Sequence, residues 1–222
     1  MSSLVLLISL SQLLSPISGN FIKETKQGKK ISEIVSGKFY YAPPSQLLFH
    51  VYNPLEQIFT FNGDTLILFY PKEKKAFKIK SLNPMVSSSV SSTWTFNDKI
   101  DFSKLGYLFV KKQKMADTLY SYWVPKGKSV IKAIIIGRLK NRMVSIEIDG
   151  VQQNQFSKIL YTKHLQHNSF CIPTETYSIQ CPPADTLIEH FTYQDIRFDI
   201  EIPDSISHFS IPNGIPVKEV VW

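Results

Sequence analysis

From Phe21 onward, apolar and polar positions alternate along most of the chain with a period of two. This period predicts β-strands, because successive side chains of a strand point to opposite faces. Turn-forming pairs such as Asn53-Pro54 and Asn62-Gly63 separate the runs. The predicted strands span residues 21–27, 31–41, 46–52, 56–61, 65–70, 75–80, 106–112, 119–124, 129–136, 142–148, 154–162, 193–203 and 216–222. The sequence therefore predicts a mainly β protein with almost no helix.

Two stretches interrupt this alternation. Residues 81–105 are rich in serine and predict a loop with a short helical turn. Residues 163–190 combine cysteine, proline and histidine and predict an irregular segment. No repeat and no low-complexity linker separates the parts of the chain, so we expect a single domain over residues 20–222.

The strand predicted for residues 65–70, TLILFY, is apolar on both faces. A strand with one face in water should instead alternate apolar and polar side chains. The predicted strands QLLFHVY (46–52), LYSYWV (119–124) and VIKAIII (130–136) share this feature. A large curved antiparallel sheet or open barrel, with an apolar interior and a partly covered exterior, accounts for several such strands. An ordinary filled core is the alternative.

The composition is typical of a folded globular protein with a net positive charge. The 222 residues are 43% hydrophobic and 19% charged, and the formal net charge is +7. Lysines concentrate in the runs KEKK (72–75) and KKQK (111–114). Such runs indicate either contact with an anionic membrane surface or a nucleic acid, or simply solvated hairpin loops. Because no RNP-like, helix-turn-helix or zinc-finger pattern accompanies the charge, we predict no nucleic-acid partner.

The first nineteen residues resemble an export signal. An apolar run from Leu4 to Leu14 is followed by Pro16 and the small residues Ser18 and Gly19. This order predicts a secretory signal peptide over residues 1–19, although no Lys or Arg precedes the apolar run. The alternative is that the segment is retained as an amphipathic helix. No cysteine lies near this segment, so it is not a lipoprotein signal.

The two cysteines, Cys171 and Cys181, are candidates for one disulfide that closes a small loop in an exported protein. With His164 and His167 they also supply four groups that bind zinc. Their order and spacing match no common zinc motif, so we predict no metal.

Catalytic signatures are missing from the sequence. No G-x-S-x-G, H-E-x-x-H or P-loop motif occurs. Asp98 with Asp101, and Asp195 with Asp199, form carboxylate pairs, but neither pair has an evident partner histidine. The sequence therefore predicts a protein that is not an enzyme and has no cofactor.

The order and spacing of several short motifs resemble one known family. The central stretch, residues 37–71, places turn and strand residues at characteristic intervals: Gly37, Pro44, Phe49, Pro54, Gly63, Thr65, Leu66 and Pro71. Further matches are YSYWVPK (120–126), SIEI (145–148) behind Gly137-Arg138, NQFSKILY (154–161) and FDIEIPDSI (198–206). Together these motifs resemble the LolA-type outer-membrane lipoprotein carriers of Gram-negative periplasms.

The resemblance implies a fold and a function. The expected fold is a half-open, incomplete antiparallel β-barrel with a lid of short helices or loops over an apolar cavity. The expected function is that of a periplasmic chaperone, a monomeric carrier in outer-membrane biogenesis. It binds lipoprotein acyl chains in this cavity and transports them from an inner-membrane lipoprotein-releasing transporter to an outer-membrane acceptor. The alternative is a periplasmic lipid- or lipoprotein-sensing module, or a glycolipid-binding module, of the same fold.

The matched strands also supply candidate cavity residues. The predicted acyl-chain site consists of Leu47, Phe49, Val51, Ile58, Leu66 and Leu68. The opposite set, Leu48, Ile67 and Phe69, stays open as an alternative, because alternation alone does not say which face is inside. The chain departs from the family pattern in three places. Pro43 stands where the family has a lid-binding Arg, residues 83–100 are poor helix formers for a lid, and residues 163–190 are expected to be an insertion.

Overall fold

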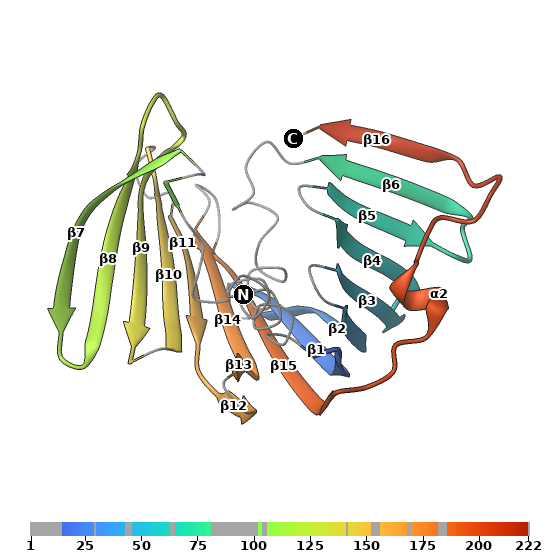
Figure 1. Cartoon of the computed structure of the whole chain (residues 1–222). Helices are drawn as coiled ribbons and strands as arrows, with labels where there is room; N and C mark the ends of the chain where they lie inside the picture. The colour runs from blue at the N-terminus through green and yellow to red at the C-terminus, as the bar shows by residue number, and fades with distance from the viewer. Residues whose placement is uncertain are drawn as a thin grey trace, which may run out of the picture. The chain divides into compact units, whose positions relative to one another are not determined.

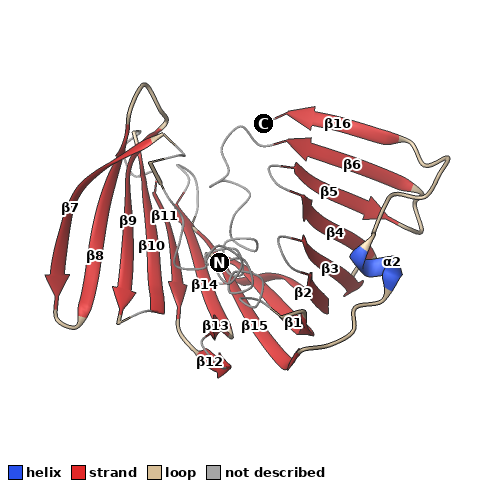
Figure 2. Ribbon diagram, viewed as in Figure 1, coloured by secondary structure: helices blue, strands red, loops and turns tan. Residues whose placement is uncertain are grey.

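The chain is a mainly β protein built on one large open antiparallel sheet (Figure 2). The computed structural model describes residues 15–28, 30–42, 46–62, 65–80, 102–103, 106–140, 142–151, 156–167, 170–181 and 186–221. The fourteen strands follow the order β16-β6-β5-β4-β3-β2-β1-β15-β14-β11-β10-β9-β8-β7. The ends of this order, β16 and β7, are not paired with each other in the described part of the chain. The predicted fold class is therefore confirmed, while the predicted lid at residues 83–100 lies outside the described residues.

Most strands pair with their sequence neighbours as antiparallel hairpins, and β16 pairs in parallel with β6. A separate two-stranded sheet joins β12 to β13. The strands are β1 (Ile17–Gln27), β2 (Lys30–Ala42), β3 (Gln46–Asn53), β4 (Gln57–Asn62), β5 (Thr65–Tyr70), β6 (Lys75–Lys80), β7 (Tyr107–Met115), β8 (Thr118–Pro125), β9 (Ile131–Leu139), β10 (Arg142–Gly150), β11 (Phe156–Tyr161), β12 (His164–His167), β13 (Phe170–Pro173), β14 (Glu175–Cys181), β15 (Leu187–Phe198) and β16 (Val217–Val221). The short helix α2 spans Asp204–Ser207. No helix in the described ranges is long and apolar enough to cross a membrane.

The packing of the chain divides it into two compact units (Figure 1). Unit 1 comprises residues 1–22, 35–91 and 193–222, and unit 2 comprises residues 23–34 and 92–192. Strands β1, β2 and β15 contribute residues to both units. The single domain over residues 20–222 stays a prediction.

In unit 1, the C-terminal segment contacts one face of β5 and pairs with the edge of β6. Phe69 of β5 is buried and packs against Phe209, with ring centroids 6.3 Å apart. The amide of Ala76 on β6 donates a hydrogen bond to the carbonyl of Pro216 at 3.2 Å. Thr60 is also buried on this face, and its hydroxyl donates to the Leu47 carbonyl at 3.0 Å, which satisfies the buried polar group. The contact with Phe209 accounts for the buried Phe69 on this face of β5.

A close backbone approach fixes how β2 meets β3. A Cβ atom added at Gly37 would lie 2.1 Å from the carbonyl oxygen of His50. The register shifts between Ser36 and Gly37, which marks a bulge at this point. Glycine is therefore required for β2 to pair with β3 in the observed register.

The prediction of an irregular segment over residues 163–190 is wrong. The structure places β12, β13, β14 and the first part of β15 there. Strand β14 was not predicted because its inner face carries Thr176 and Ser178, which are almost completely buried. Small polar residues on the inner face remove the apolar alternation that marks a strand. Whether this segment is an insertion relative to the family stays a prediction.

The predicted strand over residues 193–203 is displaced. Strand β15 begins earlier, at Leu187, and ends at Phe198. The next residue, Asp199, has a positive φ of 54° and lies outside the strand. The chain leaves the sheet at this residue and continues into α2.

Candidate functional site

One face of unit 1 carries two rows of apolar residues that cross strands β2 to β6. The register pairs residues directly across the strands, so paired side chains lie on the same face. The first row is Phe39, Phe49, Phe59, Leu68 and Phe77. The second row includes Tyr41, Leu47, Leu66 and Ile79, and Val220 of β16 extends it. We call these residues, together with Val51, the Phe49 face.

Aromatic packing anchors the Phe49 face at strands β1 to β4. The Phe49 ring meets Phe21 edge-on with centroids 5.1 Å apart and stacks on Phe59 at 4.7 Å and 10°. Phe39 lies 6.2 Å from Phe49 and 5.3 Å from Tyr193 of β15. Phe49 and Phe39 are 0% exposed. These rings form the core of unit 1.

Burial decreases along the same face from β3 to β6. Leu47, Phe49 and Val51 of β3 are completely buried. On β4, β5 and β6 the side chains in the same rows are only half-buried: Phe59, Leu66, Leu68, Phe77 and Ile79. An apolar ligand could contact these half-buried side chains without disrupting the aromatic core. This part of the Phe49 face is the candidate binding surface.

The structure places five of the six predicted acyl-chain residues on one face and separates the sixth. Leu47, Phe49, Val51, Leu66 and Leu68 belong to the Phe49 face. Ile58 instead pairs with His50 and Phe69, which puts it on the opposite face.

The prediction that Ile58 lies on the same face as the other five residues was therefore wrong. The turn between β3 and β4 determines which residues of the two strands pair, and alternation within one strand does not reveal this pairing. The alternative residues Leu48, Ile67 and Phe69 do share the opposite face. Sequence reasoning missed Phe59, Phe77 and Ile79. The alternation of apolar and polar residues in FTF and KAFKIK indicates these residues once the strand register is known.

A small polar pocket lies elsewhere in unit 1. Its volume is about 190 Å³, and its lining comes from β1, β2 and β15: Ser18, Gly19, Asn20, Lys38, Tyr40, Asp195 and Arg197. The side-chain amide of Asn20 donates to the Asp195 carboxylate at 2.8 Å. Lys38 and Tyr40 alternate with Phe39 and Tyr41 and so lie on the other side of β2.

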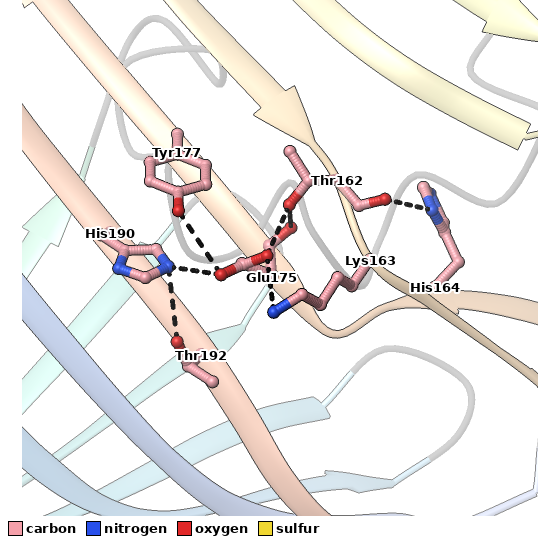
Figure 3. A network of polar contacts seen from close by, with 7 residues as sticks. All are labelled: Thr162, Lys163, His164, Glu175, Tyr177, His190 and Thr192. Carbon is pink, nitrogen blue, oxygen red and sulfur yellow. Dashed lines mark hydrogen bonds and ion pairs between the residues drawn. The ribbon is translucent and has the colours of Figure 1, made fainter.

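Unit 2 contains a polar network centred on Glu175 (Figure 3). The Glu175 carboxylate lies 2.9 Å from Nε2 of His190 and 3.3 Å from Nζ of Lys163, and the Thr162 hydroxyl donates to it at 3.0 Å. The Tyr177 ring stacks on His190 with centroids 4.2 Å apart. Thr162 and Lys163 lead into the β12–β13 hairpin, so the network ties the base of this hairpin to β14 and β15.

Electrostatics favour the charged form of this carboxylate. Burial alone would raise the pKa of Glu175, but hydrogen bonds from Thr162, His190 and Lys163 outweigh it and lower the pKa. Burial, followed by the neighbouring Glu175 charge, raises the pKa of Tyr177. Both shifts stabilise a network of carboxylate and neutral phenol.

Protein stability should fall in acid because of Glu175. A lowered folded-state pKa adds stability above the ordinary value of 4.5, and this stability is lost as pH falls through the folded pKa. We expect Glu175→Gln to lower stability at neutral pH by about 1 kcal/mol and to flatten the acid side of the profile. Urea unfolding at a series of pH values measures both effects. Glu33→Gln, which removes a half-exposed partner of Lys23, is the control for neutral pH; an equal loss there would contradict a special role for Glu175.

The predicted cysteine and histidine candidates are spread over several strands. Cys171 lies in β13 opposite Gln166, and Cys181 ends β14 opposite Phe156, with its Sγ 3.5 Å from the Thr186 hydroxyl. The structure does not join the two cysteines, and their disulfide stays a prediction. Both ring nitrogens of His164 face backbone carbonyls at 3.2 Å. No group of three metal-binding side chains occurs in the ranges that the structure covers.

Comparison with protein families identifies the chain. The model of the family described as outer membrane lipoprotein carrier protein LolA matches residues 12–172. The chain belongs to the LolA family. The match spans β1 to β12 and part of β13, and so includes every strand of the Phe49 face except β16. The resemblance seen in the sequence is confirmed, and it is to a family of carriers rather than of enzymes.

Solved structures show the same fold at low sequence identity. A LolA superfamily protein from Nitrosomonas europaea superposes with a TM-score of 0.61 at 13% identity, covering 87% of this chain and 90% of the other. A DUF1329 family protein from Desulfovibrio piger gives 0.62 at 11% identity, covering 89% and 92%. A candidate outer membrane lipoprotein-sorting protein domain from Vibrio parahaemolyticus gives 0.61 at 13% identity, covering 86% and 88%. No curated protein matches the sequence significantly.

Proposed function

We propose that this LolA-family protein is a periplasmic lipoprotein carrier that binds acyl chains on the Phe49 face. The observation that carries the proposal is the decrease in burial along that face. Side chains in the same two rows are completely buried on β3 and only half-buried on β4 to β6. Phe59, Leu68 and Phe77 are accessible side by side in one row, and contiguous accessible apolar side chains are typical of a binding surface.

The chemistry of the face suits a ligand that must be bound and later released. Each methylene removed from water contributes about 0.8 kcal/mol, so a lipid chain gains much by contact with these side chains. Apolar contact is non-directional, and no hydrogen bond has to be broken for release. A carrier of this kind needs no catalytic group.

The proposed route runs from the inner to the outer membrane. The carrier would receive triacylated lipoproteins from an inner-membrane lipoprotein-releasing transporter and deliver them, as a monomer, to an outer-membrane acceptor. Family membership supports this route. The Arg that holds the family lid is replaced by Pro43, which lies outside the described residues, so the closing contact of this carrier must differ or be absent.

Release of lipoproteins from membranes tests the proposal directly. Purified protein is incubated with inner-membrane vesicles that hold lipoproteins and their transporter, and the soluble fraction is analysed for lipoprotein bound to the carrier. A carrier should yield a soluble complex that an outer-membrane preparation can discharge. A protein that binds triacylated lipopeptide but extracts nothing would instead be the sensing or glycolipid-binding module. A protein that does neither has a filled core, and the proposal would fail.

A further inference from the structure

The edge of unit 2 formed by β7 and the β8–β9 loop is strongly basic. Between residues 107 and 132 there are six lysines and one acidic residue, Asp117, a net charge of +5. The whole chain carries +7. All six lysines are exposed: Lys111, Lys112, Lys114, Lys126, Lys128 and Lys132. We call this region the β7 edge.

Large apolar side chains are exposed among these lysines. Val130 in the β8–β9 loop is 75% exposed and Val110 of β7 is 53% exposed. Leu108, Phe109 and Met115 are also exposed. Lysines on an edge strand are a common protection against unwanted strand pairing, but this protection does not explain aliphatic side chains in water beside them.

The backbone places the β8–β9 loop, with Lys126, Lys128 and Val130, beside the first residues of β7, whereas Met115 lies at the other end of this strand, opposite Thr118. Tyr107 pairs with Pro125, and the amide of Lys126 donates to the Gly106 carbonyl at 2.9 Å. The loop that holds Val130 therefore lies beside the start of β7, as Figure 1 shows for the top of these strands. The register shift between Phe109 and Lys111 leaves Val110 as the additional residue of a bulge.

Lysine side chains lie on both faces of β7. Lys111 pairs with Tyr122 and lies 4.7 Å above the Tyr122 ring, whereas Lys112 pairs with Ser121 on the other face. In the described part of the chain, β7 has a partner strand on one side only. A surface that meets this edge would therefore contact exposed aliphatic groups flanked by lysines.

We propose that the β7 edge docks on an anionic phospholipid bilayer. Lysines attract the anionic headgroups, and Leu108, Val110 and Val130 can enter the boundary between headgroups and acyl chains. A single-stranded nucleic acid is less well matched, because its bases stack on aromatic platforms and this edge is mainly aliphatic. The inference does not rest on the proposed carrier function, since it concerns another surface and needs no lipoprotein.

Sedimentation with lipid vesicles tests the docking. The full chain should bind vesicles that contain phosphatidylglycerol and not vesicles of phosphatidylcholine alone, and salt should weaken the binding. The triple variant Lys111→Glu, Lys112→Glu, Lys114→Glu should reduce vesicle partitioning at least about tenfold. The matched control is Lys72→Glu, Lys74→Glu, Lys75→Glu, which reverses three exposed charges in the KEKK turn of unit 1 and should have a much smaller effect.

Further variants separate the alternatives. Val110→Ser with Val130→Ser should weaken vesicle binding several-fold while the salt dependence persists, and Leu68→Glu on the Phe49 face should leave it unchanged. Equal losses in the two lysine triples, or no preference for anionic vesicles, would overturn the proposal. Salt-sensitive binding of DNA or RNA without vesicle binding, or concentration-dependent self-association that the β7 triple abolishes in place of vesicle binding, would also overturn it.

Discussion

Leu68→Glu is expected to abolish acyl-chain binding while the protein stays folded. Leu68 is half-buried in the first row of the Phe49 face, between Phe59 and Phe77. A carboxylate there keeps contact with water in the free protein, but a bound acyl chain would desolvate it, and this desolvation costs several kcal/mol. With the lost leucine contact, we expect affinity to fall by at least about 100-fold. Displacement of a fluorescent fatty acid by a triacylated lipopeptide measures the loss.

Ile67→Glu is the matched control for this prediction. Ile67 precedes Leu68 on β5, is also half-buried, and lies on the opposite face, paired with Thr60 and Lys78. Its substitution should leave lipopeptide affinity within about twofold of the unmodified protein. If Ile67→Glu abolished binding and Leu68→Glu did not, the ligand would use the opposite face. If neither variant changed binding, β5 would not contact the ligand.

The fold could be predicted from the sequence wherever clear turn residues mark both ends of a strand. Strands β5 and β6 have the predicted boundaries, because their runs end at clear turn residues. Strand β14 was missed because Thr176 and Ser178 occupy its buried face. Apolar alternation therefore underestimates strands whose inner residues are small and polar.

The candidate site could be predicted only strand by strand. Alternation groups Leu47, Phe49 and Val51 correctly, because they belong to one strand. It cannot say whether Ile58 or Phe59 faces them across the β3–β4 hairpin, since a shift of one residue exchanges the two faces. Phe59 is the residue that stacks on Phe49. The packing of Phe209 on the opposite face could not be predicted either, because Phe209 and Phe69 are far apart in the sequence.

The burial of Phe49 predicts a large effect on stability rather than a selective effect on binding. Its ring is 0% exposed and contacts Phe21, Phe39 and Phe59. Phe49→Ala should lower the free energy of unfolding by about 4 kcal/mol, through lost burial and the cavity left among these rings. Phe49→Glu should prevent folding of unit 1, because it would bury a charge without a partner. Urea unfolding followed by circular dichroism measures the first variant, and soluble yield reports the second.

Tyr52→Ala on the same strand is the control for the stability effect. Tyr52 is 49% exposed, and its ring lies 4.4 Å from the His50 ring, away from the aromatic cluster around Phe49. We expect its substitution to cost about 0.5 kcal/mol. A similar cost at both positions would mean that the aromatic cluster does not hold unit 1 together. Because the half-buried rows on β4 to β6 rest on that cluster, such a result would also remove the rigid support that we propose for the acyl-chain surface.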